Sequence, residues 1–177
     1  VALSGVRASA TAMRILHVFG AVVLIGDLLF AGFWLSRAVK RGDTGLRAYV
    51  LATMAWTSKS YALPAILVNL IAGLALIHFK KTPMATALWL WIALVLYVVV
   101  TGLWHGVLIP RRKKMAALFG EPEKGAKAGT AAAAAAAGAA GAAGDFDSMA
   151  RGWLSVNGVT VLLLFVILAL MVWRPTL

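Results

Sequence analysis

Four long apolar stretches, each of about twenty residues, dominate this sequence and limit what it can fold into. They lie at about 14–36, 60–79, 86–108 and 153–173. An α-helix rises about 1.5 Å per residue, so each stretch can cross the roughly 30 Å hydrocarbon core of a bilayer. Only 13% of the 177 residues are charged and 62% are hydrophobic, unlike a water-soluble domain. The sequence therefore predicts an all-α fold, a single membrane domain formed by a four-transmembrane-helix bundle.

Proline and glycine indicate where these helices begin and end. The second helix is expected to start between residues 48 and 60, because that segment contains neither residue type. Pro64 lies inside it and predicts a kink, whereas Pro83 and Pro110 predict the ends of the second and third helices. Residues from about 120 to 148 are rich in Ala and Gly and have no apolar stripe, so we expect a mobile cytoplasmic linker there.

Basic residues cluster beside the apolar stretches and give the predicted bundle an orientation. Eleven lie near the first and third connections, at positions 37, 40, 41, 47, 111–114, 124, 127 and 151, and five lie near the opposite helix ends, at positions 7, 14, 80, 81 and 174. Since cytoplasmic loops are enriched in Lys and Arg, both termini are expected on the periplasmic side of a bacterial inner membrane. Basic clusters in this position are typical of contacts with anionic lipid headgroups. We therefore expect no nucleic-acid partner, despite the net charge of +11. The first stretch is too long for a signal-peptide core and is expected to be retained.

Polar side chains inside the apolar stretches are few and are therefore the candidate functional groups. They are His17, Asp27, Asn69, His78, His105 and Asn157, with Lys59 near a membrane interface. The sequence contains no Cys, no phosphate-binding loop and no HExxH or nucleophile-elbow motif. It therefore favours a protein without enzymatic activity.

His17 and His78 fall near the outer ends of the first two predicted helices, at similar depth. Imidazoles on neighbouring helices commonly hold a b-type haem in a membrane bundle, with small residues such as Gly20 and Gly73 leaving room for the macrocycle. The two histidines are therefore candidate haem ligands. The alternative is that both lie at the interface and hydrogen bond with water or lipid headgroups.

His105 falls at the opposite, cytoplasmic end of the third helix, so it is not expected to share a metal with the other two histidines. Gly102 and Gly106 beside it form a GxxxG step, which favours tight helix packing. Ligation of a haem or chlorin by His105 alone is the less favoured alternative.

Asp27 is predicted near the middle of the membrane, where a charged carboxylate is costly and needs a partner or a proton. By depth, Asn69 is its nearest expected polar neighbour, and Lys59 or Asn157 could approach from the cytoplasmic half. A hydrogen-bonded Asp27 that locks the bundle is favoured over a proton relay, because the sequence offers no second acid to continue a relay.

The order of these features resembles a bacterial family of predicted four-helix integral membrane proteins of unknown function. The matching segments are Leu16-His17-Val18, Ile25-Gly26 and Leu29-Phe30 on the first helix, Pro64 and Gly73-Leu74-Ala75 on the second, Trp89-Leu90 and Pro110-Arg111-Arg112 around the third, and Trp153, Met171-Val172 and Pro175 on the fourth. The resemblance covers nearly the whole chain apart from the Ala/Gly-rich tract, and it implies the same four-helix architecture.

The first helix is also distantly similar to that of a wider group containing CopD-type copper proteins and HemJ-type protoporphyrinogen oxidases. In the HemJ-type enzymes the histidine at this place is associated with haem, which implies a haem-linked role for His17. This chain has Asp27 where those relatives usually have a second Gly, and Lys59 lies too early to match the HemJ-type lysine. The resemblance thus implies a haem site and leaves enzyme activity open.

Two classes of function follow from the sequence, and they can coexist. The first is a non-catalytic accessory subunit that packs in or stabilises a larger energy-transducing membrane complex, photosynthetic or respiratory. Small soluble regions and seven Trp residues able to pack against lipid or other subunits favour it. The second is a protein that binds haem b or a chlorin, either an electron carrier or a porphyrin-handling enzyme. A transporter is least favoured, because the chain has no internal repeat.

Overall fold

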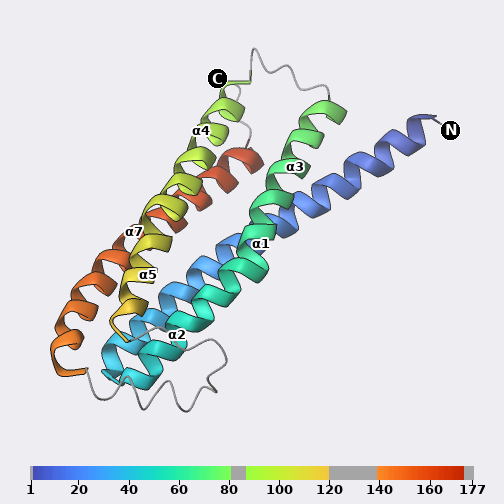
Figure 1. Cartoon of the computed structure of the whole chain (residues 1–177). Coiled ribbons are helices and arrows are strands. Elements are labelled where there is room, and N and C mark those ends of the chain that lie inside the picture. The colour runs from blue at the N-terminus through green and yellow to red at the C-terminus, as the bar shows by residue number, and fades with distance from the viewer. Residues whose placement is uncertain (1, 81–86, 120–138, 174–177) are drawn as a thin grey trace.

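The computed structural model describes residues 2–80, 87–119 and 139–173, and all regular structure within these ranges is helical. The elements are α1 (Ala2–Arg41), α2 (Thr44–Thr57), α3 (Leu63–Lys80), α4 (Leu88–Leu103), α5 (Ile109–Ala117) and α7 (Ala139–Trp173). Single π-helical turns, Ser58–Ala62 and Trp104–Leu108, join α2 to α3 and α4 to α5. The described part of the chain thus forms four helical rods, as Figure 1 shows.

All four rods contain segments long and apolar enough to span a membrane, which confirms the predicted architecture. These segments are Ala8–Arg41, Thr44–Phe79, Leu88–Ala117 and Ala143–Trp173. Many of their large apolar side chains are exposed on the outside of the bundle, as expected where lipid replaces water as the solvent.

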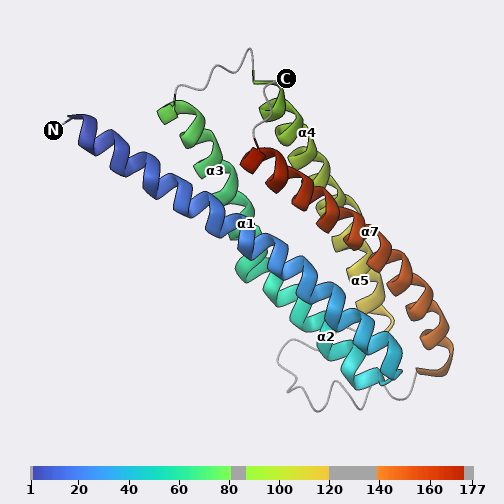
Figure 2. The same cartoon turned by 180° about the vertical axis from the view of Figure 1, so that it is seen from behind.

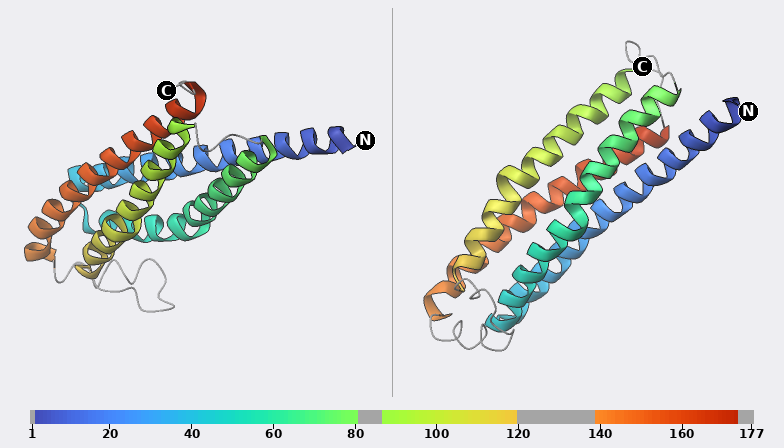
Figure 3. Two further views of the ribbon diagram at one scale, coloured as in Figure 1. Left: turned by 90° about the horizontal axis from the view of Figure 1, so that it is seen from above. Right: turned by 45° about the vertical axis from the view of Figure 1, so that its right-hand side comes forward.

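The rods run side by side and separate toward one end. α1 packs along α3 and also against α7, which in turn packs along α4 (Figure 2). Figures 1 and 3 show the N-terminal turns of α1 pointing away from the other helices. We call that end of the bundle, where α3 ends and α4 begins, the α3–α4 end, and the opposite end the α1–α2 end.

The third rod is longer than expected, because Pro110 does not end it. The helix continues through Pro110 to Ala117. The π-helical turn Trp104–Leu108 comes directly before, so Pro110 lies in the first turn of α5, where its missing N–H is tolerated. Pro64 likewise comes just after the π-helical turn Ser58–Ala62. At the place where a kink was expected, the structure therefore has a π-helical turn within a continuous rod.

Helix α7 begins at Ala139 and therefore includes residues 139–148, which were expected to belong to the linker. The expectation failed at this end because the segment does bury an apolar side chain: Phe146 is 0% exposed and its ring centroid lies 5.3 Å from that of Phe119. Alanine also has the highest helix propensity of all residues. The rest of the expected linker, 120–138, lies outside the described residues. The first helix likewise exceeds the expected 14–36 at both ends.

A tight turn joins α1 to α2. Gly42 adopts φ +69°, and its N–H donates to the carbonyl of Ala38 at 3.2 Å. Asp43 caps α2 by accepting a 2.6 Å hydrogen bond from the N–H of Leu46. The turn therefore follows the common pattern of a glycine after one helix and a capping acid before the next.

We expect Gly42→Ala to lower the free energy of unfolding by about 1 kcal/mol, because an L-residue is strained at positive φ. No atom lies within 4 Å of the added Cβ, so the cost comes from the backbone alone. Thermal unfolding in detergent, followed by circular dichroism, measures it. Gly26→Ala is the control, since Gly26 lies within α1 and also has open space around it. An equal loss in both variants would contradict the explanation.

Candidate functional site

A pocket of about 670 Å³ lies between α1, α3, α4 and α7, toward the α3–α4 end. Its wall is mainly apolar. The polar side chains in it are Arg14 and His17 from α1, Asn69 from α3 and Tyr97 from α4. The volume lies within the range of about 300–1,000 Å³ that is usual for small-molecule and cofactor sites. A mainly apolar pocket with a few converging polar groups makes this the candidate functional site.

His17 is fixed against α3 by two reciprocal hydrogen bonds. Its Nδ1 lies 2.8 Å from the backbone carbonyl of Asn69, and the Asn69 side-chain amide donates to the backbone carbonyl of His17 at 3.0 Å. Because a carbonyl oxygen can only accept, Nδ1 carries the proton. In the neutral imidazole, Nε2 then has a free lone pair, which is the tautomer found in histidines that ligate metals.

Two glycines make this arrangement possible. A Cβ at Gly73 would lie 3.0 Å from Cε1 of His17, so the imidazole occupies space that any side chain would fill. A Cβ at Gly20 would lie 3.2 Å from the carbonyl oxygen of Ala65, which shows how closely α1 approaches α3. Both glycines therefore allow close packing around His17, which is a typical use of small residues between membrane helices.

The structure does not bring His17 and His78 together. The His78 side chain is exposed and does not line the pocket, and its ring contacts that of Phe79 at a centroid distance of 5.9 Å. The expectation that the two histidines face each other considered how far along its helix each one lies, but not the direction in which its side chain points. His78 comes five residues after Gly73, which turns it by about 140° around the axis of α3.

A sulfur atom lies beside His17 instead. Sδ of Met171, on α7, is 3.3 Å from Nε2 of His17. Met171 is also part of the pocket wall. The sequence carries no local sign of this contact, because the two residues are 154 positions apart.

His105 faces outward from the π-helical turn Trp104–Leu108. Its Nδ1 donates to the carbonyl of Thr101 at 3.0 Å. The neighbouring Gly102 and Gly106 have no atom within 4 Å of an added Cβ, so the expected GxxxG packing does not occur within the described part of this chain. The pocket does not include His105.

Asp27 has partners different from those expected. Its carboxylate interacts with the side-chain hydroxyl of Thr57 and with the positive charge of Arg112. Lys59 is exposed and so does not belong to the buried polar set. Asn69 instead bonds with His17, and the side-chain amide of Asn157 donates to the carbonyl of Leu28 at 3.1 Å.

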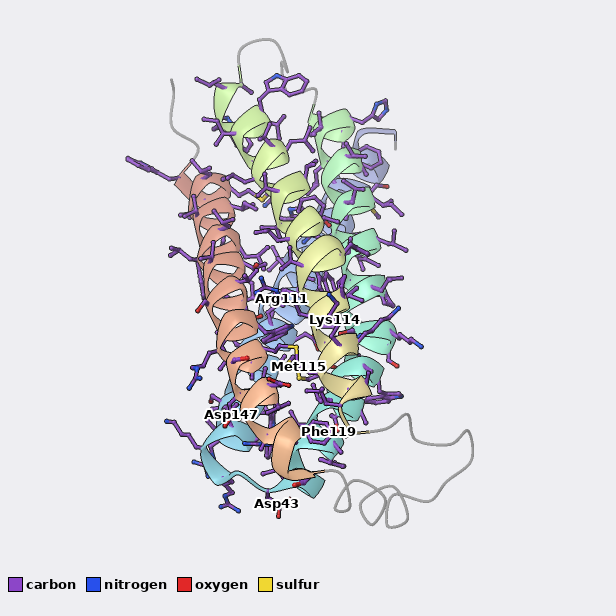
Figure 4. All side chains as sticks on the ribbon, turned by 60° about the vertical axis from the view of Figure 1, so that its left-hand side comes forward. Asp43, Arg111, Lys114, Met115, Phe119 and Asp147 are labelled. Carbon is purple, nitrogen blue, oxygen red and sulfur yellow. The ribbon has the colours of Figure 1, made fainter. Side chains whose placement is uncertain are left out.

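Arg112 and Arg47 are two buried cations that the sequence analysis treated as interfacial charges. Arg112, 8% exposed, donates to the Met54 carbonyl at 2.8 Å and to the Ser58 hydroxyl at 2.7 Å. Arg47, 3% exposed, forms a 2.7 Å ion pair with Asp147, which Figure 4 labels on α7 near the α1–α2 end. Position beside an apolar stretch does not distinguish a lipid-facing cation from a bundle-facing one. Only the direction of each side chain does.

The fold and the pocket define a multi-pass integral membrane protein with a mainly apolar pocket between the helices of its four-helix bundle. A family model described as "Predicted integral membrane protein (DUF2269)" matches residues 11–175. The chain therefore belongs to this family, which confirms the resemblance to a family of integral membrane proteins. No curated protein and no solved structure matches the chain.

Proposed function

We propose that this protein binds haem b in the pocket, with His17 as an iron ligand, and serves as an electron carrier. The observation that carries the proposal is the 2.8 Å hydrogen bond between Nδ1 of His17 and the Asn69 carbonyl. The Nδ1–H donates to the Asn69 carbonyl, so Nε2 is the ring nitrogen that remains for a metal, and it lies beside Met171 in the pocket wall. Histidines that ligate metals are oriented by such a hydrogen bond from the other ring nitrogen.

The remaining pocket residues suit haem in three respects. The volume of about 670 Å³ is of the size that cofactor sites have, and most of the wall is apolar. Arg14 lies in the wall and can pair with a carboxylate substituent of a porphyrin. Trp89 and Tyr97 provide aromatic surface. Bound haem b would supply one-electron redox chemistry, while His17 holds it and the apolar wall excludes water.

His17→Ala is expected to abolish haem binding, and His78→Ala is expected to preserve it. The measurement is the Soret absorbance per mole of protein, after purification in mild detergent from cells supplied with a haem precursor. His78 is the matched control because it lies on the same bundle but faces away from the pocket. A wild-type protein without a Soret band, or a band that persists in His17→Ala, would rule the proposal out.

A second candidate function, the accessory subunit of an energy-transducing complex, is supported by the open glycine face of the third rod. Gly102 and Gly106 are exposed and have nothing within 4 Å of an added Cβ. Such a surface suits a transmembrane helix of another subunit, because small residues let two backbones approach.

Native purification with identification of co-migrating subunits tests this second function. Gly102→Leu should release the partner, whereas Gly158→Leu should not, since Gly158 is equally open but lies on α7. A protein that always migrates alone would exclude an accessory subunit. Both functions hold if the partner and the Soret band are found together.

A further inference from the structure

A hydrogen bond fixes the level at which the third rod meets α7. The indole N–H of Trp153 donates to the Leu108 carbonyl at 3.0 Å. Leu108 ends the apolar stretch 86–108, and Trp153 begins the stretch 153–173. The two rods run in opposite directions (Figure 1), so Arg111 and Arg151 both lie just beyond these stretches, toward the α1–α2 end. The ends of apolar spans lie at the level of the phospholipid headgroups.

The guanidinium of Arg111, on α5, lies directly against the backbone of α7. A Cβ at Gly152 would be 3.1 Å from its Nη1 and 4.0 Å from its Cζ, so the guanidinium occupies the space that a side chain would fill. Figure 4 labels Arg111 on the side of α5 that is next to α7. Arg151 precedes Gly152 in α7, and both arginine side chains are exposed. Each of the two helices therefore brings an exposed arginine to this contact.

Within the part of the chain that the structure describes, neither arginine forms an ion pair. The pair found there joins Arg47 to Asp147, so the acid one turn before Arg151 is already bound by a buried cation. The other acid of α7, Asp145, lies six residues before Arg151, about 9 Å along the helix axis. Phosphate oxygens can supply the missing negative charge, because a guanidinium donates two parallel hydrogen bonds to them.

We propose that Arg111 and Arg151 bind the phosphate of an anionic phospholipid, as a discrete lipid site at the contact between α5 and α7. The headgroup level of both residues favours a lipid over a soluble phosphate. A zwitterionic headgroup would add a positive charge beside two unpaired cations, so the site is expected to prefer phosphatidylglycerol to phosphatidylcholine. Neither arginine lines the pocket described above, so the site does not depend on haem binding.

Gly152 distinguishes a discrete site from a general attraction between basic residues and anionic lipid. A general attraction depends on the net charge, whereas a discrete site also depends on where the Arg111 guanidinium lies. Gly152→Val keeps the net charge but fills the space of that guanidinium. Gly158→Val is the matched control, since Gly158 lies on the same helix and has open space around it. Arg111→Gln and Lys113→Gln each remove one exposed cation from α5, so their comparison tests position.

The test titrates the full-length protein in detergent with phosphatidylglycerol or phosphatidylcholine and measures bound lipid by native mass spectrometry. We expect the wild type to bind phosphatidylglycerol more tightly than phosphatidylcholine. Arg111→Gln and Gly152→Val should each weaken phosphatidylglycerol binding by about fivefold or more, the loss that corresponds to one cation beside an anionic headgroup. Lys113→Gln and Gly158→Val should match the wild type.

Several results would overturn the site. Equal losses in Arg111→Gln and Lys113→Gln, or wild-type affinity in a folded Gly152→Val, would show that net charge alone attracts the lipid. Equal binding of the two lipids by the wild type would also exclude it. Displacement of phosphatidylglycerol by an equal concentration of inorganic phosphate would assign the two arginines to a soluble anion instead. Far-UV circular dichroism checks the fold of each variant, and if Gly152→Val does not fold, the comparison of Arg111→Gln with Lys113→Gln decides.

Discussion

Arg112→Ala is expected to destabilise the protein by about 3 kcal/mol or more, because it removes a buried cation together with its hydrogen bonds and leaves their acceptors without a donor. The guanidinium donates to the Met54 carbonyl and the Ser58 hydroxyl, and it is the cation that interacts with Asp27. Without it, a carboxylate within the bundle loses its countercharge. The measurement is the free energy of unfolding in mixed detergent micelles, from a denaturant titration followed by tryptophan fluorescence.

Two comparisons separate this effect from a general loss of positive charge. Lys113→Ala removes a neighbouring charge from an exposed side chain and is expected to change stability by less than about 0.5 kcal/mol. The double variant Asp27→Asn/Arg112→Met should recover much of the loss, since it removes both charges together. If Arg112→Ala is no less stable than Lys113→Ala, the buried Arg112 side chain does not stabilise the bundle.

Gly20→Leu is expected to separate α1 from α3 and to lower the free energy of unfolding by about 3 kcal/mol. Even a Cβ at this position would lie 3.2 Å from the Ala65 carbonyl oxygen and 3.3 Å from the Asn69 backbone nitrogen. Because both are backbone atoms, no side-chain rotation can relieve the crowding. The two hydrogen bonds between His17 and Asn69 span the same interface and should break with it.

The same change at Gly26 provides the control for Gly20→Leu. Gly26 lies on α1 six residues further along and has no atom within 4 Å of an added Cβ. We expect Gly26→Leu to keep the stability of the wild type within about 0.5 kcal/mol. If wild type binds haem, Gly20→Leu should also lose the Soret band while Gly26→Leu retains it. Equal stability of the two leucine variants would contradict the close approach of α1 and α3.

Hydropathy predicted the four spans because the cost of placing a side chain in lipid depends on the residue and little on its neighbours. It also directed attention to His17, Asp27 and Asn69, which line or support the interior. It was less successful at helix ends. The helix passes Pro110 because a π-helical turn precedes it, and α7 begins early because Phe146 has a buried partner in Phe119. Both depend on packing between or along helices.

The sequence by itself therefore determined the solvent of this protein, its all-helical class and the few polar groups placed within its spans. The side of the membrane on which the termini lie stays a prediction from the charge count. Only the tertiary structure decided which groups act on one another: His17 contacts Met171 rather than His78, and the charge that acts on Asp27 is that of Arg112 rather than that of Lys59. The physical reason is rotation. Successive residues are rotated by about 100° around the helix axis. The position of a residue along its helix therefore does not determine which neighbour its side chain faces, and only the packing of the helices does.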